Sequence, residues 1–159
     1  MQKPVIVSAC LVGEKCRYDG KSCRDPALEK KLIGLKIITV CPEQLGGLST
    51  PRPRARIVGK RGAADGNDVV DGEARVVTFE GKDVTKAFLD GAREALRIAR
   101  ETGGRVAVFK AKSPSCGCGS IFAENFSHKK AGDGTTTAML KKNGIKVYTE
   151  ENFRSIDDV

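Results

Sequence analysis

The sequence predicts a mixed α/β domain, with a three-layer, mostly parallel, Rossmann-like sheet, helices on both faces and an irregular β-ribbon insertion. Three short apolar runs typical of strands alternate with helical segments, at residues 4–8, 36–40 and 105–109. A stretch rich in Gly, Pro and Arg, near residues 46–82, follows neither periodicity. Because 159 residues with 40% hydrophobic content can bury one core, we expect residues 1–159 to form a single domain.

Three helices are expected among these strands. Asp25-Pro26 starts a short helix that continues to about Ile33, because Pro is favoured at the first helical position and Gly34 ends it. The longest helix is expected from an N-cap at Asp83 to about Thr102, where two glycines follow. Its apolar residues recur at helical spacing and form a core face: Val84, Phe88, Ala92, Ala95, Leu96 and Ala99. A last helix is expected over about residues 135–142, followed by a strand over residues 145–148.

The insertion is expected to contain a surface β-ribbon and a basic loop. Residues 73–79 have the composition of a strand, and residues 68–71 are its expected partner. Residues 51–61 hold five basic side chains and no acidic one, and their prolines prevent a helix. We favour a solvated loop here. The alternative is an arm that contacts phosphate, since Arg binds phosphate through two parallel hydrogen bonds.

Composition limits the classes of partner and the location. The net charge of +8, from 28 basic and 20 acidic side chains, favours anionic partners. An extended nucleic-acid platform is not favoured, because the chain has two Tyr, no Trp and no aromatics interleaved with the basic run. No apolar stretch approaches the roughly 18–20 residues that span a bilayer, and the N-terminus lacks the apolar segment of a signal peptide. We therefore expect a cytoplasmic protein without a membrane partner, whose thiols stay reduced.

Three of the six cysteines, Cys10, Cys41 and Cys116, each lie just past a predicted strand. Ligands in parallel sheets bind beyond the carboxyl ends of the strands, so these three thiols are expected to meet in one crevice. Converging thiolates that form no disulfide are ligands for soft metals, above all iron–sulfur clusters, and three of them leave one corner open to a substrate. The spacings contain no CxxC pair, unlike zinc ribbons and ferredoxin repeats. The remaining thiols stay open as second ligands, redox-active groups or inert neighbours: Cys16, Cys23 and Cys118.

Two further features point to chemistry near these thiols. Residues 113–120 (SPSCGCGS) combine serines, cysteines and glycines, so backbone N–H groups and hydroxyls can approach a ligand closely. Glu43, two residues beyond Cys41, is the carboxylate best placed for acid–base work; the alternative is a surface glutamate on a loop. The only histidine, His128, lies in a basic segment and is not expected to bind metal, since catalytic zinc sites usually need more histidines.

Ordered motifs along the whole chain resemble those of the thiouracil desulfidase (TudS) family, formerly a domain of unknown function. The opening signature is SACLVG at residues 8–13, followed by CRYDG at residues 16–20. The later motifs are VCPE at residues 40–43, GGL at 46–48, PRP at 51–53, SPSCG at 113–117 and GDGTTTA at 132–138. The resemblance is specific for the family and less specific for the substrate.

The resemblance implies a 4Fe–4S cluster held by Cys10, Cys41 and Cys116, with the fourth iron free. A thiolated pyrimidine would place its sulfur on that iron, and water would replace the sulfur at the ring carbon without net redox chemistry. The implied catalytic residues are Glu43 and one serine of the SPSC run. Ser113 is the first choice for this serine and Ser115 the second. Cys118 departs from the family pattern, which leaves an alternative ligand arrangement open.

The substrate and the fate of the sulfide stay open at this level. Free thiouracil and thiouridine nucleotides both fit the resemblance, and the basic run favours an anion. We therefore assign Arg52, Arg54 and Ser115 to substrate binding and expect 4-thiouridine monophosphate to be preferred. Sulfide would leave as hydrogen sulfide or pass to an acceptor. The competing hypotheses are a non-catalytic metal-binding module, with zinc or a cluster, and a nucleic-acid-associated protein, which only the charge supports.

Overall fold

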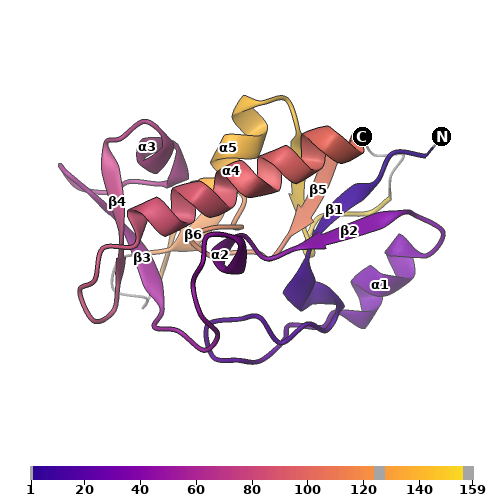
Figure 1. Cartoon of the computed structure of the whole chain (residues 1–159), viewed down its shortest axis with the longest axis horizontal. Helices are drawn as coiled ribbons and strands as arrows, with labels where there is room; N and C mark the ends of the chain where they lie inside the picture. The colour runs from indigo at the N-terminus through magenta and orange to yellow at the C-terminus, as the bar shows by residue number, and fades with distance from the viewer. Residues whose placement is uncertain (1, 124–127, 156–159) are drawn as a thin grey trace.

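The computed structural model describes residues 2–123 and 128–155 and has a parallel sheet at its centre (Figure 1). The sheet has four strands in the order β2-β1-β5-β8, and every neighbouring pair runs parallel. These strands are β1 (Val5–Ser8), β2 (Ile37–Val40), β5 (Val106–Phe109) and β8 (Lys146–Thr149). The predicted fold class is confirmed, and each predicted strand of the sheet is found within one residue at either end.

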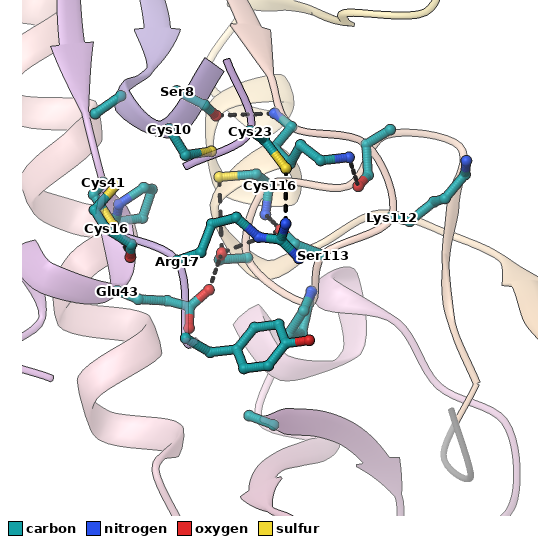
Figure 2. A pocket seen from close by; sticks show the side chains of 18 of the residues that line it. Ser8, Cys10, Cys16, Arg17, Cys23, Cys41, Glu43, Lys112, Ser113 and Cys116 are labelled. Atoms are coloured by element: carbon teal, nitrogen blue, oxygen red, sulfur yellow. Dashed lines mark hydrogen bonds between the residues drawn. The ribbon is translucent and has the colours of Figure 1, made fainter. Parts of the chain in front are cut away.

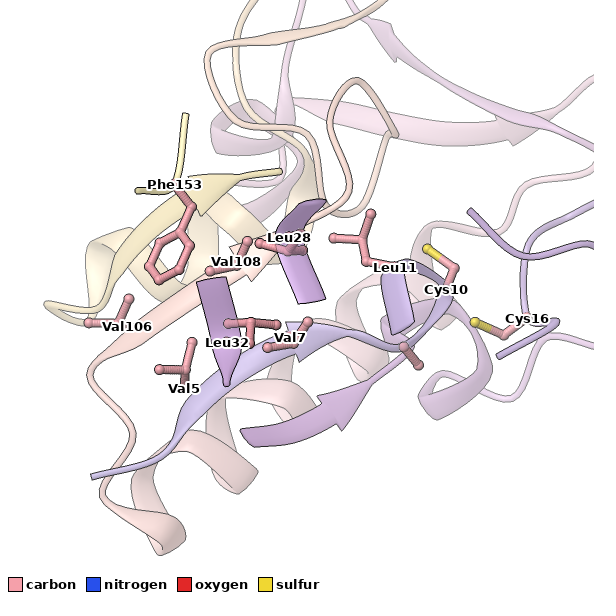
Figure 3. Packing of buried hydrophobic residues seen from close by; sticks show 11 residues of the cluster. Val5, Val7, Cys10, Leu11, Cys16, Leu28, Leu32, Val106, Val108 and Phe153 are labelled. Carbon is pink, nitrogen blue, oxygen red and sulfur yellow. The ribbon is translucent and has the colours of Figure 1, made fainter. Parts of the chain in front are cut away.

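Helices cover both faces of this sheet, as expected. α1 (Pro26–Leu32) lies on one face, and α4 (Thr85–Thr102) and α5 (Thr135–Lys142) lie on the other (Figure 1). Successive residues of β1 point to opposite faces, because a strand has a two-residue period. Val5 and Val7 therefore join the core under α1, with Leu28, Leu32 and Phe153 (Figure 3). Ile6 joins the core under α4 and α5, with Ala95, Ala99 and Leu140.

The helix boundaries follow local capping. Asp25 caps α1 as predicted, because its side chain accepts a hydrogen bond from the backbone N–H of Leu28 at 3.0 Å. α4 begins at Thr85, with Val84 at the N-cap position, while Asp83 accepts a hydrogen bond from the Thr85 N–H at 2.9 Å. The predicted N-cap at Asp83 is therefore wrong by one residue, since Asp83 lies one position before the N-cap. α5 has the predicted bounds.

The insertion differs from the prediction in two places. Its ribbon pairs β3 (Ala55–Gly59) antiparallel with β4 (Ala74–Thr78), so the strand predicted over residues 73–79 is confirmed. Its predicted partner at residues 68–71 is wrong: these residues lie in α3 (Gly66–Val70) and at its end, because Asp65 and Asp68 form a reciprocal capping box. The prediction of a solvated loop over residues 51–61 is also wrong for residues 55–59, which form β3. Ala55 and Ile57 of this strand are buried against α3 and α4.

Four short elements complete the fold: η1 (Ala9–Val12), α2 (Pro42–Leu45), β6 (Ser120–Phe122) and β7 (Lys129–Ala131). α2 packs closely on α4, because Gly91 has no side chain; a Cβ atom there would lie 1.9 Å from the Pro42 carbonyl oxygen. This contact fixes the residues that directly follow β2. No helix in the described part of the chain is long and apolar enough to cross a membrane.

Candidate active site

The three cysteines predicted to converge line one cavity at the carboxyl edge of the sheet. Cys10 lies in η1 directly after β1, Cys41 lies at the N-cap position of α2 directly after β2, and Cys116 lies in the loop after β5. The cavity has a volume of about 260 Å³. In the sheet, β1 has β2 on one side and β5 on the other, so the strand order reverses at β1. The cavity lies beyond this point, which is the usual ligand position in such sheets. Figure 2 shows the labelled thiols gathered around this cavity.

The other three cysteines lie in different surroundings, two of them in the cavity lining and one outside it. All six thiols are free of disulfides. Cys16 and Cys23 also line the cavity, and the Cys23 sulfur accepts a hydrogen bond from Arg17 Nη1 at 3.0 Å. Cys118 lies only two residues after Cys116, yet its thiol lies outside the cavity lining and donates to the Val147 carbonyl of β8 at 3.4 Å. The geometry thus offers five thiols to a ligand in the cavity and directs the sixth away.

Three of the cavity thiols, those of Cys16, Cys41 and Cys116, have a raised pKa. Cys16 lies in hydrogen-bonding contact with the thiols of Cys10 and Cys41, and the contact with Cys10 raises the pKa of Cys16 to about 11. Contact with Cys16, together with burial, raises the pKa of Cys41 above its ordinary value. Burial raises the pKa of Cys116 to about 12. Because burial and contact with other thiols favour the neutral form, metal binding to these thiols would release protons.

The donor set and the surrounding charge fit an anionic iron–sulfur group. No three His, Cys, Asp or Glu side chains among residues 2–123 and 128–155 are arranged to hold a single metal ion. The available donors in the cavity are mainly thiols, which are ligands for soft metals. The lining also carries five cations: Arg17, Arg52, Arg54, Lys110 and Lys112. Three of them form ion pairs, Arg52 with Glu43, Lys110 with Glu150 and Lys112 with Glu151. The cations still outnumber these carboxylates by two, which favours a negatively charged group.

Glu43 lies in the first turn of α2 and faces the cavity, with 16% of its side chain exposed. Both of its carboxylate oxygens have partners. Arg52 Nε donates to Oε1 at 3.0 Å, and the Ser115 hydroxyl donates to Oε2 at 2.8 Å. Ser113 is placed differently: its hydroxyl accepts the Cys116 N–H at 2.7 Å and lies 3.4 Å from the Ser115 hydroxyl. The serine that contacts Glu43 is thus Ser115, and Ser113 shapes the loop that presents Cys116.

The two arginines assigned to the substrate have different surroundings. Arg52 is almost fully buried, with 6% of its side chain exposed, and its guanidinium donates to protein oxygens. The Arg54 guanidinium lies between two aromatic rings, 5.4 Å from the centre of Tyr18 and 5.2 Å from that of Phe122. Arg17 stacks on Tyr18 as well, at 5.5 Å. These cation–π contacts hold two guanidinium groups in the cavity lining.

Sequence reasoning assigned no role to several lining residues. Arg17 and Tyr18 directly follow Cys16 in the CRYDG motif, so their position beside a cavity cysteine was a signal that the sequence offered. Lys110 and Lys112 follow β5, at the sheet edge where ligands are expected. Phe122 belongs to β6, and no pattern in the sequence marks it. His128 is exposed and is not part of the cavity lining.

The fold and the site define a class: an α/β protein with a thiol-rich site for a soft metal at the carboxyl edge of its parallel sheet. The chain belongs to the 2-thiouracil desulfurase family, whose model matches residues 5–152. This confirms the family that the sequence motifs indicated. A curated relative, the uncharacterized protein YbbK of Bacillus subtilis (strain 168), is 40% identical over 153 residues, which are 96% of this chain and 99% of that protein. A solved structure of the [4Fe-4S]-dependent thiouracil desulfidase TudS has 39% identity and a TM-score of 0.79, over 96% of this chain and 93% of that one.

Proposed function

We propose that residues 1–159 work as a single iron–sulfur desulfidase domain, which replaces the sulfur of a thiolated pyrimidine by oxygen and releases sulfide. The observation that carries this proposal is the convergence of Cys10, Cys41 and Cys116 on one cavity that also contains Glu43. Membership of the 2-thiouracil desulfurase family and the likeness to a [4Fe-4S]-dependent thiouracil desulfidase support it.

In this proposal Cys10, Cys41 and Cys116 hold a 4Fe–4S cluster. When bound, a cluster with one iron free of protein ligands supplies a soft Lewis acid for the sulfur of the substrate. The cationic lining of the cavity supports this cofactor, because it offsets the negative charge of the cluster and its thiolates. We place the protein in the cytoplasm, because thiols that hold a cluster must stay reduced and the cytoplasm keeps them so.

The protein residues supply proton transfer and orientation. Glu43 is the proposed base: it accepts a proton from the water that attacks the ring carbon and returns one to the ring nitrogen or the departing sulfide. The Ser115 hydroxyl, which bonds to Glu43 Oε2, holds the carboxylate toward the substrate. Ser113, two residues away on the same loop, is the proposed hydrogen-bond donor to the ring or its sulfur. Water and the thiocarbonyl thus give a carbonyl and hydrogen sulfide, with no change of oxidation state.

The cationic cavity also supports an anionic substrate, such as 4-thiouridine monophosphate. Arg54 and Arg17 line the cavity and both stack on the Tyr18 ring, so they place positive charge at the wall where a phosphate would bind. Ser115 and Arg54 keep their assignment to substrate binding. Arg52, the third member of that set, has most of its donors engaged by protein oxygens. The released sulfide leaves as hydrogen sulfide or passes to an acceptor.

Anaerobic reconstitution with iron and sulfide, followed by a substrate panel, tests the proposal. We expect about four irons and four sulfides per chain, with visible iron–sulfur absorbance, and turnover of 2-thiouracil, 4-thiouracil or their nucleotides to the oxygen form. Cluster binding without any turnover would make the protein a metal-binding module. Turnover by the metal-free protein would refute the role of the cluster.

A further inference from the structure

Arg52 is a buried cation whose guanidinium group joins three segments of the chain. Its Nε donates to Glu43 Oε1 at 3.0 Å, and its Nη2 donates to the Cys16 carbonyl at 2.9 Å. Its Nη1 donates to the Thr50 hydroxyl at 2.9 Å and to the Ser49 carbonyl at 3.2 Å. Four of the five guanidinium N–H bonds are therefore used within the protein.

The partners of Arg52 are themselves parts of the site. Glu43 accepts a second hydrogen bond from Ser115, which belongs to the loop that presents Cys116. The carbonyl of Cys16 lies 3.8 Å from the Cys41 sulfur, which donates to it. The backbone N–H of Arg52 donates to the Tyr18 carbonyl at 2.8 Å and holds the same loop again. Arg52 therefore ties the loop containing Cys16 and Tyr18 to the turn of α2 that carries Glu43.

From these contacts we infer that Arg52 is a positioning residue, which acts through Glu43 and the loop of Cys16 and does not contact the substrate. A carboxylate with only one fixed oxygen rotates about its side-chain bonds, whereas Glu43 has each oxygen held from a different side. The planar, forked shape of arginine reaches Glu43 and Cys16 at the same time, which the single ammonium of lysine does not do. This inference rests on the proposed desulfidase activity and replaces the assignment of Arg52 to phosphate binding.

The inference predicts a specific pattern of kinetic effects. Arg52→Gln should lower kcat about tenfold or more, and should change KM by less than about threefold for the free base and for the nucleotide alike. Arg52→Lys should restore kcat only in part. In a Glu43→Gln background, adding Arg52→Gln should cost less activity than it costs in the unsubstituted protein, because one of the two groups through which Arg52 acts is already disabled. Arg56→Gln is the matched control, since Arg56 lies on β3, outside the cavity lining, and should leave kcat unchanged.

Hydrogen exchange gives a readout that does not depend on turnover. Arg52→Gln should speed amide exchange in the loop of Cys16 and Tyr18, while Arg56→Gln should not. The iron content of both variants should equal that of the unsubstituted protein, because Arg52 holds none of the three proposed ligand side chains. If Arg52→Gln does not fold, Arg52→Lys carries the same comparisons.

Each outcome separates this inference from the proposed function. An active protein in which Arg52→Gln raises KM for the nucleotide alone, with kcat unchanged, would make Arg52 a phosphate contact and overturn the inference. Additive losses in the double variant would also overturn it, since Arg52 would then act independently of Glu43. An unsubstituted protein that binds the cluster and turns over no thiolated pyrimidine would refute the proposed function, and the inference with it.

Discussion

The close contact between α2 and α4 allows a quantitative test of how the fold positions the site. A Cβ atom at Gly91 of α4 would lie 1.9 Å from the Pro42 carbonyl oxygen and 3.2 Å from the Gly46 backbone nitrogen. Carbon and oxygen normally approach to about 3.3–3.6 Å. Gly91→Ala therefore requires α2 to move by about 1.4 Å, and α2 carries Glu43 and has Cys41 at its N-cap position.

Two opposing effects determine the stability of this variant. Alanine is favoured over glycine in a helix interior by about 1 kcal/mol, and overpacking of a tight contact costs about 1–3 kcal/mol. We expect the free energy of unfolding to fall by about 0–2 kcal/mol, so the variant should still fold. The activity should suffer far more, because a displacement of about 1 Å at a catalytic group costs roughly 100-fold in rate.

Urea unfolding of the metal-free protein and kcat per cluster-loaded chain would measure the two effects. Lys86→Ala, at an exposed position on α4, is the control and should change neither by more than a small amount. If Gly91→Ala gained about 1 kcal/mol of stability and kept its full turnover, α2 would not be held by this contact and the reasoning would be wrong.

Three further predictions follow from the site. Replacing any one of the proposed ligands Cys10, Cys41 and Cys116 by serine should abolish or destabilise cluster binding, whereas Cys23→Ser should keep its iron. Full iron retention in Cys41→Ser would contradict the ligand assignment. Glu43→Gln should keep the cluster and lose about 10²–10⁴-fold in turnover, measured on iron-normalised protein, and an active variant would show that another group transfers the proton. 4-Thiouridine monophosphate should have a higher kcat/KM than free thiouracil, and Arg54→Ala should remove this advantage without harming the free base; equal losses for both substrates would assign Arg54 a structural role.

The meeting of the three cysteines was predictable because it follows from a rule of topology. Each follows an apolar run, and parallel strands bring their carboxyl ends to one edge. The same logic placed Glu43 in the cavity, since it lies two residues after Cys41. The sequence did not reveal which serine contacts Glu43, because Ser113 and Ser115 differ only in the turn of a loop whose shape depends on contacts with other segments.

The sequence by itself determined the elements whose signals are local. The bounds of α5, the cap of α1 and the apolar face of α4 depend on residues within a few positions of one another, and these were predicted. Only the tertiary structure decided the state of the arginine-rich stretch. Residues 55–59 become a strand because β4 pairs with them, and Arg52 is buried because Glu43 and the carbonyl of Cys16 satisfy its charge and donors. These partners come from other segments of the chain. Local composition therefore predicts exposed residues at positions that contacts with those segments bury.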